Sequence, residues 1–98
     1  MYLVYITFPS KKEAARICKI LIKEKLAACA NIVSSNSLFF WKGKLNEARE
    51  SIAFLKLKTE NYKKLEARVK ELHSYELPAI LALDVKQAEK KFKKWVRA

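Results

Sequence analysis

The chain has 98 residues, of which 51% are hydrophobic and 32% are charged. This length is enough for one domain, which we expect to span residues 1–98, and the composition excludes a disordered chain. The net charge of +11 favours anionic partners, and the charges are mostly Lys and Glu, a bias that also marks thermostable proteins. No apolar run approaches the ~20 residues of a membrane span and no basic leader precedes a cleavage site, so we expect a cytoplasmic protein without a membrane partner.

The first predicted elements are a strand and a helix. Residues 2–8 are β-branched, aromatic and nearly continuously apolar, as in a central strand, and Pro9 ends the run. Ser10 and Glu13 form a capping-box pattern, in which each side chain satisfies a free backbone donor at a helix start. Apolar residues then recur at helical spacing, which predicts a helix from about 11 to 26.

A hairpin follows this helix. Residues 28–34 predict a second strand, which residues 38–41 resume after a polar stretch that suggests a bulge. Gly43 is the only glycine and is expected where the backbone needs a positive φ, at the hairpin tip. Residues 50–59 return as a third strand with alternating faces, so that Phe54 and the lysines at 56 and 58 share one face.

The last elements repeat the helix and strand order. Thr59 or Asn61 can cap a second helix, which should end near His73. Residues 77–85 predict a fourth strand, and the apolar spacing of residues 88–96 predicts a short amphipathic helix at the C-terminus.

The order β-α-β-β-α-β-α predicts the fold class. Two right-handed βαβ units joined by a hairpin give an α+β, ferredoxin-like split sandwich, with an antiparallel sheet, helices on one face and an extra C-terminal helix. Large apolar side chains remain for the other face, namely Tyr5, Phe39, Trp41, Ile52 and Phe54. Because one small helix covers little of that face, we expect copies of the chain to associate through it.

The segment from His73 to Pro78 is the first candidate for function. It holds the only histidine, a tyrosine and a carboxylate where a helix pattern gives way to a strand pattern. A lone histidine at a helix end is, however, more often a capping or surface residue. Of the two cysteines, Cys18 falls on an apolar helix stripe, as an inert thiol does, whereas Cys29 begins a strand and remains a candidate.

Three separated blocks resemble the CutA family of divalent-cation-tolerance proteins, namely Glu24 to Ile32, Phe40 to Lys44 and Val69 to Ile80. The resemblance implies a ferredoxin-like protomer, a tight cytosolic homotrimer joined through long hairpins, kinship with the trimeric PII proteins, and a role in copper or other divalent-ion tolerance without an enzymatic reaction. Where this family usually has a proline, the chain has Ser74, which loosens the peptide after His73.

The matching blocks supply three candidate metal ligands, Cys29, His73 and Glu76. A thiolate with an imidazole suits copper or zinc better than magnesium or calcium. In the split arrangement a six-residue strand holds Cys29 and His73 about 20 Å apart, so a shared site needs two subunits of a head-to-tail trimer. The other residues expected at this contact are Lys56, Lys58 and Tyr75 in the cleft, with Lys58 opposite Cys29, and Trp41, Phe39 and Phe54 in the trimer interface.

Purely structural roles for these residues, and functions other than metal binding, stay open. Cys29 can be a small core residue, Glu76 an interface ion pair and Trp41 a packing aromatic. A PII-like signalling scaffold that binds a small anion or a protein partner fits the composition equally well. Nucleic acid is not the expected partner, because Phe92, Trp95 and Val96 form one docking stripe and the aromatic signature of RNA-binding sheets is absent. An enzyme is not expected either, since no catalytic triad, phosphate loop or carboxylate pair can be assembled.

Overall fold

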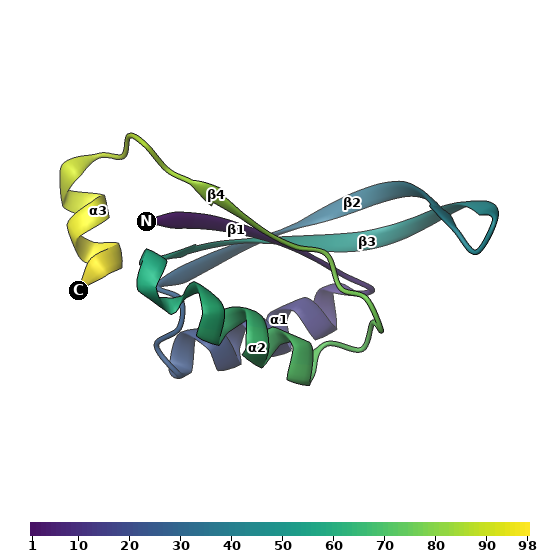
Figure 1. Ribbon diagram of the computed structural model, residues 1–98, viewed down its shortest axis with the longest axis horizontal. Helices are drawn as coiled ribbons and strands as arrows, with labels where there is room; N and C mark the ends of the chain where they lie inside the picture. Colours follow the sequence, from purple (N-terminus) through teal and green to yellow (C-terminus); the bar gives the residue numbers. More distant parts are fainter.

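A computed structural model describes residues 1–98 as a four-stranded antiparallel sheet with two helices on one face and a third at one end (Figure 1). The sheet order is β2-β3-β1-β4. The elements are β1 (Tyr2–Phe8), α1 (Lys11–Lys23), β2 (Cys29–Trp41), β3 (Lys44–Leu57), the short 3-10 helix η1 (Thr59–Asn61), α2 (Tyr62–Leu72), β4 (Ile80–Asp84) and α3 (Lys90–Arg97). The predicted α+β, ferredoxin-like class with an added C-terminal helix is confirmed.

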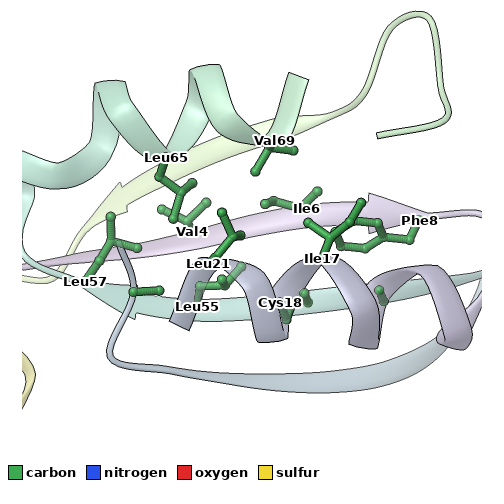
Figure 2. Close-up of a cluster of buried hydrophobic side chains, with 13 residues drawn as sticks. Val4, Ile6, Phe8, Ile17, Cys18, Leu21, Leu55, Leu57, Leu65 and Val69 are labelled. Carbon is green, nitrogen blue, oxygen red and sulfur yellow. The ribbon is translucent and has the colours of Figure 1, made fainter. Parts of the chain in front are cut away.

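The core lies between the sheet and the pair α1 and α2. Alternate residues of β1 (Val4, Ile6 and Phe8) have no exposed surface, because a strand directs every second side chain to the same face. Figure 2 shows these side chains meeting Leu21 from α1 and Leu65 from α2. The alternation of β3 is also confirmed, since its alternate residues 53, 55 and 57 complete this cluster.

The start and end of α1 differ in detail from the prediction. The Ser10 hydroxyl accepts a hydrogen bond from the Glu13 N–H at 3.1 Å, so this half of the capping box is confirmed. The Glu13 carboxylate does not return to Ser10; it accepts from the Ser74 N–H at 3.0 Å. The helix ends at Lys23 and not at residue 26, because Lys25 adopts a φ of 61° and turns the chain towards β2.

The hairpin is longer and more regular than predicted. Every residue of β2 from Cys29 to Trp41 has a partner on β3 in one unbroken register, so the predicted bulge is wrong, and β3 starts at residue 44 and not 50. The turn is Lys42 and Gly43, with φ values of 51° and 76°, as a two-residue hairpin turn of type I′ requires. The outer half of this hairpin extends beyond the two helices (Figure 1) and beyond β1, whose last partner on β3 is Ser51, and we call it the arm (residues 35–50).

The second half of the chain follows the predicted order with shifted boundaries. α2 ends at its C-cap His73 as predicted, but its N-terminal residue Asn61 makes no capping hydrogen bond and donates instead to the Lys25 carbonyl at 3.2 Å. β4 is shorter than the predicted span of 77–85, because the residues before Ile80 leave the sheet. No helix in the structure is both long and apolar enough to cross a bilayer.

The sheet face opposite α1 and α2, which we call the open face, carries the side chains that were predicted for it. Tyr5 and Phe54 lie edge to face there with ring centroids 5.9 Å apart, and Phe39 and Trp41 continue the same face along the arm with 39% and 44% of their surface exposed. The arm also exposes apolar side chains on its other side, at Leu38, Phe40 and Leu45. The chain therefore presents apolar surface on both faces of the arm.

Candidate functional site

The segment from His73 to Ala79 closes the end of the sheet where β1 finishes. His73 is the C-cap of α2, and its side chain has no exposed surface. Its ring stacks on Phe8 at a centroid distance of 4.8 Å and an interplanar angle of 12°. This packing fixes the imidazole against the end of β1.

Both ring nitrogens of His73 have partners. Nε2 lies 2.7 Å from the carbonyl oxygen of Thr7, and Nδ1 lies 3.0 Å from the backbone nitrogen of Tyr75. Because a carbonyl only accepts and an N–H only donates, Nε2 carries the hydrogen and Nδ1 offers its lone pair to Tyr75. Nδ1 also lies 3.6 Å from a carboxylate oxygen of Glu13. Both ring nitrogens thus have partners within the chain, and in this conformation the imidazole offers no lone pair to a metal ion.

Two carboxylates hold the residues that follow His73. Glu13 accepts from the Ser74 N–H, and its pKa is lowered, because burial, which raises it, is outweighed by hydrogen bonds from Ser74 and by the charge of Arg16. Glu50, on the open face of β3, accepts a hydrogen bond from the Tyr75 hydroxyl. Burial and this bond to a carboxylate raise the pKa of Tyr75, so its hydroxyl stays a donor. The segment is therefore fastened to β1, α1 and β3.

Glu76 and Tyr75 border a large hollow on the open face. Its volume is about 780 Å³, and it runs from the start of the segment along the arm. Besides the segment itself, its walls are formed by Tyr5, Thr7, Ser35, Ser37, Phe39, Trp41 and Glu50, among others. Glu76 is exposed, so its carboxylate is accessible to a neighbouring molecule.

Cys29 lies at the far end of the open face. Its partner in the register is Lys56 and not Lys58, so the predicted pairing with Lys58 is wrong. The ammonium of Lys56 donates to the Asn31 side chain and to the Phe54 carbonyl, the latter at 3.2 Å. Lys58 lies one residue past the end of β3 at Leu57, and its side chain lines a separate hollow of about 380 Å³ beside α3.

The two cysteines differ in chemistry. Cys18 is buried in the core, and this burial raises the pKa of its thiol to about 11. Cys29 is only partly buried and unpaired. Of the two thiols, only that of Cys29 is positioned to meet a ligand from outside the chain.

Within one chain the predicted ligands do not meet. Cys29 is aligned through Lys56 with Leu3, whereas His73 contacts Thr7, four residues further along β1. This offset and the two intervening strand spacings place the thiol and the imidazole roughly 16 Å apart. Accordingly, no group of three His, Cys, Asp or Glu residues that could hold a metal ion occurs in the subunit, and the residues of one chain do not fit such a site.

A family profile described as CutA1 divalent ion tolerance protein matches residues 2–98. This chain belongs to that family. The divalent-cation tolerance protein CutA of Pyrococcus horikoshii is 40% identical over 98% of this chain and 94% of its own length, and that of Archaeoglobus fulgidus is 41% identical over 95% and 91%. The resemblance stated from the three sequence blocks is confirmed.

Solved structures give the same result for the fold. A crystal structure of CutA1 from Pyrococcus horikoshii superposes with a TM-score of 0.95 at 38% identity, covering 98% of this chain and 94% of that one. A structure described as the PII-like protein CutA from Nostoc sp. PCC 7120 superposes with a TM-score of 0.93 at 27% identity, covering 99% and 94%. The Archaeoglobus fulgidus structure, described as a periplasmic divalent cation tolerance protein CutA, has a TM-score of 0.95 at 40% identity, covering 98% and 95%.

Two carboxylates of this region were not predicted from the sequence. Glu50 and Glu13 fasten the segment after His73, yet neither was considered beyond a helix cap and a strand start. The position of Glu50 could have been predicted from strand alternation. It lies two residues before Ile52 in β3, so both side chains lie on the open face. No pattern in the sequence connects Glu13 with Ser74, because the atom that Glu13 binds is a backbone N–H.

Proposed function

We propose that this chain is a single domain that assembles into a cytoplasmic, thermostable homotrimer, and that the trimer binds copper or a similar metal ion at clefts between subunits. Its contribution to divalent-cation tolerance is then binding and not catalysis. The observation that carries the proposal is the apolar open face with its arm, which a single subunit leaves in water. The thiol of Cys29 is free, in keeping with a reducing compartment.

Both edges of the sheet support assembly. β2 presents an edge of 13 residues and β4 one of five residues, and neither edge has a partner strand. An exposed edge of this length is a template for another strand. A head-to-tail contact between different edges closes into a ring when its rotation fits, and three copies give a trimer that leaves no edge unused.

Assembly also supplies what the metal site lacks. A contact that brings the start of β2 in one subunit to the segment after His73 in the next joins the Cys29 thiol to the Glu76 carboxylate. A thiolate in the set favours copper or zinc over magnesium or calcium. His73 joins as the third ligand only if Nδ1 releases the Tyr75 N–H, so we propose Cys29 and Glu76 as the first contacts.

Sedimentation combined with copper titration tests this proposal. We expect a trimer at micromolar protomer concentration, and loss of copper affinity in Cys29→Ala. Cys18→Ala is the matched control, because it removes a thiol that burial keeps protonated, and it should bind copper as the unmodified chain does. A stable monomer would refute the assembly, and a trimeric Cys29→Ala variant with unchanged copper affinity would refute the site.

A second candidate is a signalling scaffold, favoured by the structural similarity to the PII-like protein from Nostoc. The hollow on the open face and the excess of lysines would then serve a small anion or a protein partner. Anion binding that survives in Cys29→Ala, together with no measurable copper binding, would favour this alternative.

A further inference from the structure

α3 separates two kinds of side chain onto opposite sides of a short helix. Five of its eight residues are cations and the other three are apolar, namely Phe92, Trp95 and Val96. At 100° per residue these three fall within one arc of about 100°, and all five cations fall outside it. The helix is therefore strongly amphipathic, although it lies at the surface of the molecule.

Only part of the apolar arc is used by the fold. Val96 is 4% exposed and borders the hollow beside α3, and Arg97 holds the helix through an ion pair with Glu60 at 3.0 Å. Phe92 and Trp95 remain 39% and 54% exposed, with ring centroids 5.9 Å apart. A docked helix thus leaves two neighbouring aromatic rings in water.

The lysines of α3 form no ion pair within the chain, and the carboxylate beside them, that of the N-cap Glu89, accepts a hydrogen bond from the Phe92 N–H at 2.8 Å. Lys90, Lys91, Lys93 and Lys94 are all exposed, and none of them forms an ion pair. α3 lies at the end of the molecule opposite the tip of the arm (Figure 1). We call Phe92, Trp95 and these four lysines the α3 surface.

We propose that the α3 surface binds the face of an anionic phospholipid bilayer. Lysines attract the phosphate headgroups, and an aromatic pair beside them enters the interfacial layer, where amphipathic rings are stable. The segregation of charge from aromatics favours lipid over nucleic acid, because stacking on bases needs rings within the cationic groove and not on a separate arc. This inference goes beyond cation tolerance and does not depend on the metal site.

Vesicle co-sedimentation at physiological salt tests the proposal with the full chain. We expect binding to phosphatidylcholine vesicles that contain about one-third phosphatidylglycerol, and none to pure phosphatidylcholine. The double variant Lys93→Gln with Lys94→Gln should weaken binding roughly 30-fold, since two attractive charges are lost. Trp95→Ala should weaken it about tenfold, because the inserted apolar surface is lost.

A matched control separates a defined surface from general attraction by the net charge. Lys11→Gln with Lys12→Gln makes the same charge change on exposed residues at the start of α1 and should leave binding unchanged. In a Trp41→Phe variant Trp95 is the remaining tryptophan, and its emission should shift to the blue with anionic vesicles.

Several results would overturn the proposal. These are no binding to anionic vesicles, equal weakening by the control pair, or binding that Trp95→Ala leaves intact. A duplex oligonucleotide that binds more tightly than the vesicles and displaces them would assign the surface to nucleic acid. Subunit number, measured in the same preparations, is an independent readout, so a trimer that ignores vesicles refutes this inference and leaves the assembly standing.

Discussion

Replacing His73 by alanine removes the contacts that fasten the segment between α2 and β4. The imidazole has no exposed surface, makes hydrogen bonds to Thr7 and Tyr75, and stacks on Phe8. Each hydrogen bond contributes roughly 1 kcal/mol and the ring stack roughly 1 kcal/mol more. We therefore expect the free energy of unfolding to fall by about 3 kcal/mol, a large part of the total for a small domain.

Denaturant unfolding at one fixed protomer concentration measures this loss, since assembly would make stability depend on concentration. His73→Phe keeps the stack and loses both hydrogen bonds, so it should cost about 2 kcal/mol. Ser74→Ala is the matched control and should change stability by less than about 0.5 kcal/mol, because Ser74 is exposed and alanine keeps the backbone N–H that Glu13 accepts. Nitrogen NMR should find the hydrogen on Nε2.

Two results would contradict these contacts of His73: a loss of stability in His73→Ala no larger than that of the Ser74 control, or a ring hydrogen found on Nδ1. Either result would mean that the lone pair of Nδ1 is not committed to Tyr75. In that case His73 returns as an available metal ligand.

Three further predictions concern the turn, the thiols and acid stability. Gly43→Ala should lower the free energy of unfolding, measured with denaturant, by about 1 kcal/mol, because a φ of 76° is strained for alanine. No atom lies within 4 Å of the new methyl group, so no steric clash adds to this cost. An unchanged free energy of unfolding would contradict the prediction. A thiol reagent at neutral pH should modify Cys29 rapidly and Cys18 only on unfolding, because burial raises the pKa of Cys18 to about 11; equal rates would count against it. The Glu60 carboxylate accepts hydrogen bonds from its own backbone N–H, from Arg97 and from Thr59, and these lower its pKa to about 2. The stabilisation that Glu60 gives is therefore complete above its ordinary pKa of 4.5 and is lost as the pH falls towards 2. An NMR titration midpoint near 4.5 would refute this.

The order of the elements could be predicted because their hydrophobic periods are clear where the core covers them. β1 is nearly continuously apolar, and the alternation of β3 is legible from Ile52 onward, where the helices lie against the sheet. The predicted bulge and the late start of β3 share one cause. Residues 35–37 and 44–49 lie in the arm, beyond the helices, so no core imposes a pattern on them.

The candidate site was predicted in part, for a different reason. The chain could indicate that His73 ends a helix and that Cys29 begins a strand, and both placements hold. The sequence could not indicate that the imidazole has hydrogen-bond partners. One of them is the backbone carbonyl of Thr7, 66 residues away, and every residue type has such a carbonyl. The pairing of Cys29 with Lys58 was wrong because the predicted register between β2 and β3 was shifted by two residues. Such a shift keeps each side chain on the same face of the sheet but gives it a different partner, here Lys56.

The arm has a consequence for how a newly made subunit survives in the cell. Its two-residue turn fixes the strand pairing locally, so the hairpin can close before β4 has been synthesised. From that moment a long β2 edge and the side chains of Leu38, Phe40 and Leu45 are open to any other unfolded chain. In the proposed trimer, association with another copy of the chain would compete with aggregation. We therefore expect the soluble yield to depend on the synthesis rate more steeply than it does for a protein of this size without such an arm.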